Sequence, residues 1–127
     1  MIEGVSQVIV DVEDQDRALR FWTETVGFEL IQDAPYGEAG RWIEVRTRDK
    51  ATNLVLGLRQ GDRPTAPEEL PTSNVFFYCD DLQHTYDELR ASGVEFPQPP
   101  VQQSWGWWSM FQDQEGNRFA LHPREAT

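Results

Sequence analysis

The chain repeats itself, and this internal repeat restricts the possible folds more than any other feature of the sequence. Residues typical of strand starts, helix caps and helix ends recur in the same order in both halves: Gln7 with Asn74, Asp14 with Asp81, Gly27 with Gly93, Glu29 with Glu95, Gly40 with Gly106 and Trp42 with Trp108. A one-residue deletion near the helix brings these pairs into register. Because order, caps and turns agree together, we predict two copies of one structural unit.

The first half has the pattern of a strand, a helix and three further strands. Val8, Val10 and Val12 share one face of a strand predicted over residues 5–12. Asp14 is a typical helix cap, and Gly27 ends the apolar helical pattern that follows it. The further strands are predicted over residues 28–31, 41–46 and 53–58, with a loop over residues 33–40.

The second half has the same pattern. It predicts a strand over 74–79, a helix from the Asp81 cap to Gly93, a strand over 94–96, a connection over 97–104 and a hairpin over 104–121. Residues 60–73 hold three prolines and no periodic pattern, as in a linker. We therefore predict an α+β fold in a single domain, residues 1–127. It consists of two tandem βαβββ modules, about 1–59 and 74–127, joined by the Pro-rich linker 60–73.

Aromatic residues concentrate in the last hairpin. Because strand side chains alternate, Trp108 and Met110 are predicted on one face, and Trp107 and Phe111 on the face toward the helix. Paired modules of this kind form a curved mixed sheet around a concave cleft, with the helices on the convex side. The side chains expected to face the cleft are Gln7, Ile9, Asp11, Asn74, Phe76, Tyr78, Trp42, Trp108 and Met110, with Trp105 as a further candidate.

Charge and composition exclude some classes of partner. The formal net charge of −11 opposes binding to nucleic acid or to an anionic membrane, and no basic run offsets it. The same charge favours solubility and is compatible with a cationic ligand. The sequence has the pattern of neither a signal peptide nor a membrane span, so we expect a cytoplasmic protein. Cys79, the one cysteine, is expected to be a buried structural thiol.

Two segments carry a family resemblance. Asp14 followed by residues 20–30, RFWTETVGFEL, and residues 113–119, DQEGNRF, are close to the helix-to-strand and final-turn patterns of the vicinal oxygen chelate superfamily. This superfamily includes glyoxalase I, extradiol dioxygenases and the bleomycin-resistance proteins. The resemblance covers nearly the whole chain and implies the fold predicted above, usually as a homodimer. It does not decide among the many chemistries of that fold.

The resemblance also implies four positions for a metal ion. Enzymes of the family hold a divalent ion with His, Glu or Gln side chains from the first and last strand of each half. In this chain the positions are Gln7, Gly57 or a neighbour of Gly57, Asn74 and Ala120. Glycine and alanine have no ligand atom, and two neutral amides give such an ion little reason to leave water. We therefore expect no metal and no cofactor.

Other polar residues leave alternatives open. His122 shares a face with Ala120 and could donate a hydrogen bond or act as a base at the rim of the cleft, whereas His84 is expected to be solvated. Glu44 and Arg46 are expected to pair with each other slightly more than to recognise a ligand. No catalytic arrangement is evident in the sequence, so we predict no catalytic residue.

Two functions follow from these observations. The first is a metal-independent binding protein, resembling the bleomycin-resistance proteins, that sequesters a bulky aromatic antibiotic or metabolite. The alternative is a glyoxalase-like lyase or isomerase, or a dioxygenase, with an unconventional metal site; a metabolite sensor or accessory subunit is a further possibility. The predicted ligand-binding residues are Gln7, Trp42, Glu44, Asn74, Phe76, Tyr78, Trp105, Trp108, Met110 and His122.

Overall fold

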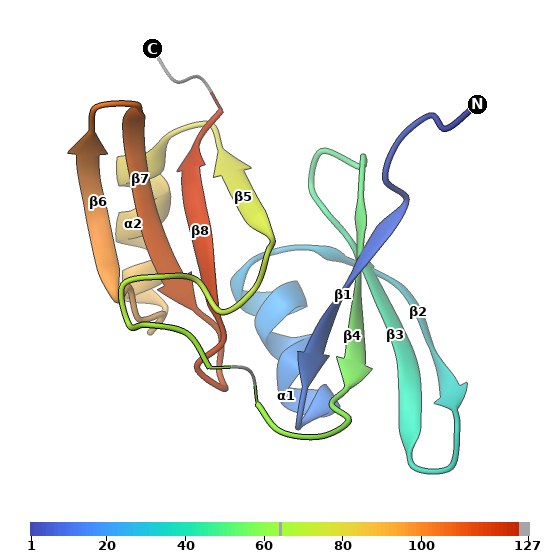
Figure 1. Ribbon diagram of the computed structural model, residues 1–127. Helices are drawn as coiled ribbons and strands as arrows, with labels where there is room; N and C mark the ends of the chain where they lie inside the picture. Colours follow the sequence, from blue (N-terminus) through green and yellow to red (C-terminus); the bar gives the residue numbers. More distant parts are fainter. Residues whose placement is uncertain (64, 125–127) are drawn as a thin grey trace. The chain divides into compact units, whose positions relative to one another are not determined.

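The computed structural model describes residues 1–63 and 65–124, and these form two units with the same order of elements (Figure 1). The first unit, Met1–Arg63, contains β1 (Gln7–Val12), α1 (Gln15–Arg20), the short π-helix η1 (Phe21–Thr25), β2 (Glu29–Tyr36), β3 (Gly40–Arg46) and β4 (Asn53–Leu58). The second unit, Pro64–Thr127, contains β5 (Phe76–Cys79), α2 (Leu82–Ala91), β6 (Gln98–Gln103), β7 (Gly106–Gln112) and β8 (Arg118–Pro123). The predicted α+β class and the tandem βαβββ modules are confirmed.

Each unit has its own four-stranded mixed sheet. The strand order is β1-β4-β3-β2 in the first sheet and β5-β8-β7-β6 in the second. The first and last strands of each unit are parallel neighbours, whereas the other neighbouring strands are antiparallel. In the first unit α1 contacts β3 and β4, and in the second α2 contacts β6 and β8. One face of each sheet is therefore covered by the helix of its own unit.

The helices begin and end where the sequence predicts. The carboxylates of Asp14 and Asp81 each accept a hydrogen bond, at 3.0 Å, from the backbone N–H three residues ahead. Gly27 and Gly93 follow the helical segments with φ of 91° and 95°, a backbone conformation that side chains other than glycine seldom adopt. No helix in the part of the chain that the structure describes is long and apolar enough to cross a membrane.

Two strand predictions need correction. β2 continues to Tyr36, so most of the predicted loop 33–40 is a strand paired with β3. The predicted strand at 94–96 is absent, and the edge strand β6 lies instead in the predicted connection 97–104. Pro99 and Pro100 suggested a break in structure. However, an edge strand tolerates proline, and both residues lie where the register of β6 on β7 shifts.

The strand pairing fixes the repeat more closely than the sequence does. Ile9 lies opposite Val55 in the first sheet, and Phe76 lies opposite Ala120 in the second. Because β1 corresponds to β5, the residue equivalent to Ala120 is Val55. The prediction named Gly57 or a neighbour of Gly57 for this position, and the strand pairing places Val55 there. The offset between the two halves changes from 66 to 65 between these strands, because the β7–β8 turn is one residue shorter than the β3–β4 turn.

Each unit buries its own apolar core between sheet and helix. The first core comprises Val10, Val12, Ala18, Trp22, Ile43, Val45, Leu54 and Leu56, all buried. In the second core the Phe111 ring lies 5.5 Å from Phe119 and 5.9 Å from Phe77. A fully buried side chain of this size contributes roughly 1.5–3 kcal/mol to folding, so these residues account for much of each unit's stability.

A side chain completes each sheet where its last two strands separate. In the first unit, the buried Gln15 amide donates to the carbonyls of Arg41 (2.7 Å) and Leu56 (2.8 Å) and accepts from the Arg41 N–H (3.0 Å). In the second unit, the Ser109 hydroxyl donates to the carbonyl of Leu121, which corresponds to Leu56, at 3.1 Å. Buried carbonyls need a hydrogen-bond donor. Where the hydrogen bonds between the two strands end, a side chain therefore provides this donor.

Candidate ligand-binding faces

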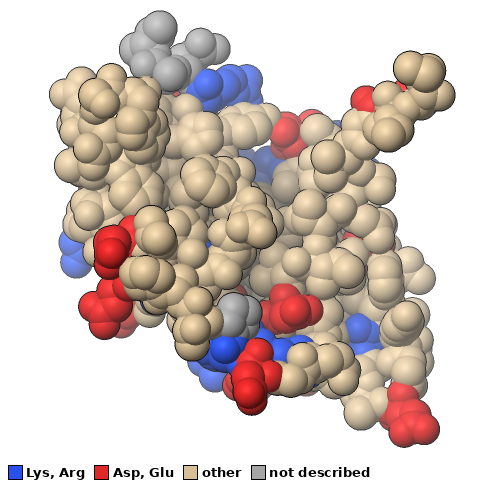
Figure 2. Space-filling model, in the orientation of Figure 1, with Lys and Arg blue, Asp and Glu red and all other residues tan. Residues whose placement is uncertain are grey.

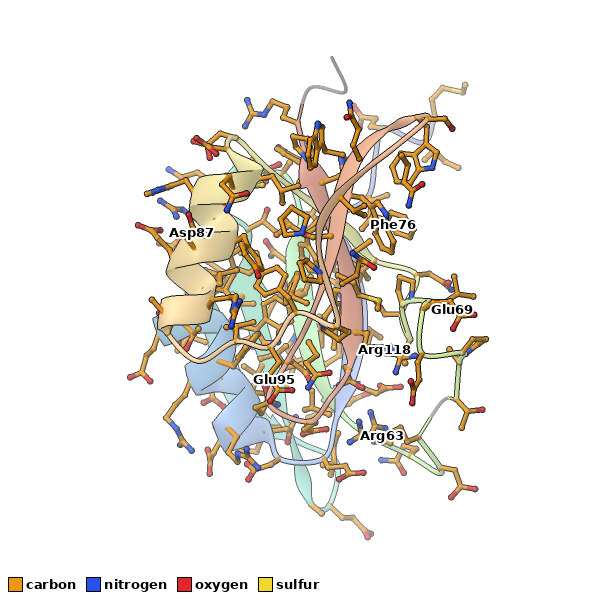
Figure 3. All side chains as sticks on the ribbon, turned by 90° about the vertical axis from the view of Figure 1, so that its left-hand side faces the viewer. Arg63, Glu69, Phe76, Asp87, Glu95 and Arg118 are labelled. Carbon is orange, nitrogen blue, oxygen red and sulfur yellow. The ribbon has the colours of Figure 1, made fainter. Side chains whose placement is uncertain are left out.

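The face of each sheet that is turned away from its helix carries the predicted site residues. Residues opposite each other on neighbouring strands share a face, so the pairing defines this helix-free face. In the first unit it holds Gln7, Ile9, Asp11, Gln32, Ala34, Tyr36, Trp42, Glu44, Arg46, Asn53, Val55 and Gly57. In the second unit it holds Phe76, Tyr78, Gln98, Val101, Trp108, Met110, Gln112, Arg118, Ala120 and His122. Figure 3 shows Phe76 and Arg118 on one side of the second sheet and Asp87 of α2 on the other.

In the first unit, two side chains of the helix-free face, Trp42 and Asn53, donate hydrogen bonds to Glu44. The Trp42 indole N–H donates to Glu44 Oε1 at 2.9 Å, and the Asn53 amide donates to Glu44 Oε2 at 2.5 Å. The expected pairing of Glu44 with Arg46 does not occur, because the carboxylate is held by these two neutral donors instead. The carboxylate of Glu44 is thus fixed in orientation, and no ion pair within residues 1–63 and 65–124 neutralises its charge.

Trp42 also belongs to an aromatic pair. The Tyr36 ring meets the Trp42 ring edge to face, with their centroids 5.4 Å apart, and Tyr36 is 56% exposed. Sequence reasoning missed Tyr36 because it assigned residues 33–40 to a loop. Residues 31–36, IQDAPY, show no regular alternation of apolar and polar residues, so the sequence held no local signal for the longer strand.

The helix-free face of the second unit is largely apolar. Phe76 is 64% exposed and Tyr78 is 44% exposed, whereas Met110 and Ala120 beside them are buried. Figure 2 shows this face of the second unit from the front, and the surface over β7 and β8 is almost entirely without charged residues. Arg124 adds a cation near the end of β8, with its guanidinium carbon 5.0 Å from the centre of the Tyr78 ring.

The tryptophans of the last hairpin divide as predicted between the two faces. Trp108 lies on the helix-free face, opposite Val101, and its ring centre is 6.3 Å from that of Trp105 in the turn. Phe111 packs in the core, whereas Trp107, on the same face as Phe111, is 47% exposed. The Trp108 indole N–H is buried and has no hydrogen-bond partner among the described residues.

His122 and the two amides complete the predicted set. Nδ1 of His122 lies 2.9 Å from the Pro123 carbonyl oxygen, and because a carbonyl can only accept, Nδ1 is the donor of this hydrogen bond. Gln7 is exposed at the start of β1. Asn74, also exposed, precedes β5, so the prediction that β5 begins at Asn74 was wrong by two residues.

The positions at which the resemblance implies a metal ion do not suit one. With the corrected register they are Gln7, Val55, Asn74 and Ala120, of which Val55 and Ala120 have no side-chain donor atom. No group of three or more His, Cys, Asp or Glu side chains that could hold an ion occurs among residues 1–63 and 65–124. Divalent transition metals and calcium are bound by imidazole, thiolate or carboxylate groups, and these positions offer only two neutral amides.

Two further titratable groups are structural. Burial raises the pKa of the Cys79 thiol, so this cysteine is a poor nucleophile. The buried Asp113 organises the β7–β8 turn, because its carboxylate accepts from the Glu115 and Asn117 N–H groups at 2.9 Å and from the Asn117 amide at 2.8 Å. Burial nevertheless raises the pKa of Asp113, and the three hydrogen bonds only partly oppose this effect.

Comparisons with known proteins agree with this arrangement. A model of the glyoxalase/bleomycin resistance protein/dioxygenase superfamily matches residues 4–121. YetH, an uncharacterized protein of Bacillus subtilis (strain 168), is 37% identical over 124 residues, which cover 95% of this chain and 98% of YetH. The crystal structure of TnmS3, an antibiotic binding protein from Streptomyces sp. CB03234, is 34% identical with a TM-score of 0.78 over 98% of each chain.

A further solved structure extends the likeness. A superfamily member from Sphaerobacter thermophilus DSM 20745 is 29% identical, with a TM-score of 0.82 over 97% of this chain and 98% of that one. The family model, the relatives and the strand order thus lead to the same assignment. This chain belongs to the glyoxalase/bleomycin resistance protein/dioxygenase superfamily.

Proposed function

We propose that this protein binds a bulky aromatic small molecule, without a metal ion and without chemical turnover. The observation that carries this proposal is the pair of large aromatic side chains, Phe76 and Tyr78, exposed on β5, with Ala120, which has no side-chain donor atom, opposite Phe76. Exposed rings on a regular strand gain little for folding, but they offer flat area on which another ring can stack. Each such contact contributes roughly 1 kcal/mol beyond the burial of area.

Similarity to a binding protein supports the class of ligand. TnmS3, which is 34% identical over nearly the whole chain, is described as an antibiotic binding protein. We infer that the ligand here is likewise an antibiotic or a related aromatic metabolite. Binding it in the cytoplasm would lower its free concentration and thereby protect the cell.

We propose that the contacts are made by the predicted residues and by Tyr36. These residues are Gln7, Tyr36, Trp42, Glu44, Asn74, Phe76, Tyr78, Trp105, Trp108, Met110 and His122. The family resemblance also leads us to propose a homodimer, which light scattering coupled to size-exclusion chromatography tests through the molar mass. A mass equal to that of one 14.7 kDa chain at micromolar concentration would contradict the dimer.

Two neighbouring residues provide the first test of binding. We expect Phe76→Ala to weaken binding of an aromatic ligand about fivefold, because one stacking contact is lost, while thermal stability changes little. The matched control is Phe77→Ala, whose ring contacts Phe111 and Phe119 in the core. Because Phe77 is half-buried, that variant should lose about 3 kcal/mol of unfolding free energy, the lower end of the range for a phenylalanine in a core.

Quenching of tryptophan fluorescence against a panel of aromatic antibiotics measures the affinity, and urea unfolding measures the stability. Equal binding by Phe76→Ala and the wild type for every ligand of the panel would contradict the proposed site. If no compound binds below millimolar concentration, the proposed function is wrong.

Metal analysis separates the proposed function from the enzymatic alternative. We expect a substoichiometric metal content after purification from metal-supplemented medium, and unchanged ligand affinity after treatment with a chelator. About one ion per chain that is lost in Gln7→Ala, together with metal-dependent turnover, would instead support a lyase, isomerase or dioxygenase.

A further inference from the structure

The Glu44 carboxylate is held in place by groups that do not neutralise it. Its two oxygens accept one hydrogen bond each, from the Trp42 indole at 2.9 Å and from the Asn53 amide at 2.5 Å. A carboxylate offers about four acceptor sites, so each oxygen can accept again. Glu44 is half-buried on the central part of β3, and no ion pair among the described residues includes it.

The surroundings of Glu44 favour a ligand that is both flat and cationic. Along β3, Trp42 with its partner Tyr36 lies on one side of Glu44, and Arg46 lies on the other, toward the β3–β4 turn. A positive group would therefore approach over the aromatic pair, away from Arg46. Opposite Glu44 on β4 lies Val55, whose apolar side chain is buried and cannot compete for a hydrogen bond.

The equivalent place in the second unit has no charge. β3 corresponds to β7, and the residue at the Glu44 position is Met110, which lies between Ala120 and Gln98 on the neighbouring strands. The two units share their backbone pattern, but only the first presents a carboxylate on the helix-free face at this point. The charge is therefore not a requirement of the fold.

We propose that Glu44 selects ligands in which a protonated amine is attached to an aromatic ring system. The ammonium group donates a charge-assisted hydrogen bond to Glu44, while the ring lies against Trp42 and Tyr36. This inference rests on the proposed function, since it names the class of ligand for Tyr36, Trp42 and Glu44 on the helix-free face of the first unit, which are among the proposed contacts. A charge-assisted hydrogen bond of this kind corresponds to about a tenfold gain in affinity over a neutral donor.

The test uses two probes that differ in charge alone: anthracene carrying an aminomethyl group and anthracene carrying a hydroxymethyl group. We expect the wild type to bind the amine at least about tenfold more tightly at pH 7, and Glu44→Gln to lose this preference while binding the alcohol as before. Glu44→Asp, which keeps the charge but withdraws it by one methylene, should retain part of the preference. Glu24→Gln, an exposed residue of η1, is the control for the change in net charge and should behave as the wild type.

The outcomes separate the two proposals. If the wild type binds both probes equally, or if folded Glu44→Gln keeps the preference, the role of Glu44 is wrong while aromatic binding stands. If neither probe nor any compound of the antibiotic panel binds, the proposed function is wrong as well. Circular dichroism melts of each variant, with Glu44→Asp as the second substitution at this position, establish that a lost preference is not a loss of fold.

Discussion

Gln15 makes, with one side chain, the hydrogen bonds that a neighbouring strand would otherwise make. Its amide contacts the Arg41 N–H and carbonyl and the Leu56 carbonyl, all at the end of the first sheet where β3 and β4 separate. The residue at this place in the second unit is Leu82, the first residue of α2. The two units therefore use different side chains at this place. In the second sheet the Ser109 hydroxyl donates the hydrogen bond to the corresponding carbonyl, that of Leu121.

We predict that Gln15→Leu, which gives the first unit the residue of the second, lowers the unfolding free energy by about 1–3 kcal/mol. The physical reason is that buried backbone groups of β3 and β4 lose their partner, although the apolar volume is kept. Urea unfolding measures the effect. Gln83→Leu is the control, because Gln83 is exposed on α2 and bonds only to a neighbouring carboxylate. Equal stability of Gln15→Leu and the wild type would contradict the bridging role.

Asp113 predicts a pH dependence of stability. Burial raises the pKa of this carboxyl above its ordinary value of 3.8, so the folded protein takes up the proton at a higher pH than the unfolded chain does. Between the two pKa values the native state binds more protons, and the contribution of Asp113 to stability therefore increases as the pH falls and decreases as it rises. A carbon-detected NMR titration of the folded protein should give a midpoint for Asp113 above 3.8.

A midpoint at or below the ordinary value would mean that the three hydrogen bonds outweigh burial. The opposite behaviour is expected of Asp33, whose pKa is lowered first of all by its hydrogen bond with Arg41. The stabilisation by Asp33 is present above pH 3.8 and is lost as the pH falls through the lowered pKa. Because Asp33 is exposed, that contribution is small.

At the scale of elements, the linker is attached to the second unit by one residue of β8. The Arg118 guanidinium donates to the carbonyls of Leu70 (2.9 Å), Pro67 (2.8 Å) and Ala66 (3.2 Å), and the Arg118 backbone N–H donates to the Thr72 hydroxyl at 2.7 Å. The labelled Arg118 and Glu69 in Figure 3 mark the two sides of this attachment. A segment without regular structure thus gains a defined path along the start of β8.

We predict that Arg118→Ala speeds hydrogen exchange in the linker selectively. The amides of Leu70 and Thr72, which are bonded within this attachment, should exchange about tenfold faster, because the guanidinium bonds that hold the segment are gone. Exchange of the core strand amides should stay unchanged. Arg90→Ala on α2 is the control for removing an exposed arginine. Uniformly faster exchange throughout the second unit would contradict a local role.

An element could be predicted from the sequence when the residues that define it lie close together in the chain. The last hairpin and the two capped helices were predicted nearly to the residue, since caps, turn glycines and alternation lie within a few positions of one another. β6 was missed because its two prolines suggest a break, and only its position at the sheet edge makes them acceptable. β2 was cut short because nothing local distinguishes a long exposed strand from a loop.

For the whole molecule, the repeat predicted the architecture, but not the contacts of the candidate site. Glu44 illustrates the limit. From the sequence it is a ligand-binding candidate, yet it was expected to pair with Arg46. Its partners are Trp42 on the same strand and Asn53 on β4. These contacts depend on the directions of the three side chains, and a pattern of residue types does not specify side-chain directions. The register of β4 was uncertain for a similar reason, because it depends on the length of one turn.

The net charge of −11 and the single carboxylate of Glu44 should affect different steps of binding. The overall field attracts a cationic ligand over distance, so it acts on association, whereas a local hydrogen bond acts on dissociation. Raising the salt concentration from about 0.1 M to about 1 M shortens the Debye length from about 10 Å to about 3 Å, which removes most of the overall field.

We therefore predict that high salt slows association of the aminomethyl probe severalfold with little change in its dissociation, and that Glu44→Gln does the reverse. Stopped-flow fluorescence of the wild type and Glu44→Gln at both salt concentrations separates the two rates. The hydroxymethyl probe, which is uncharged, should show neither effect. If salt alters dissociation as strongly as Glu44→Gln does, the local contact is an exposed ion pair, and the orientation provided by Trp42 and Asn53 contributes nothing to selectivity.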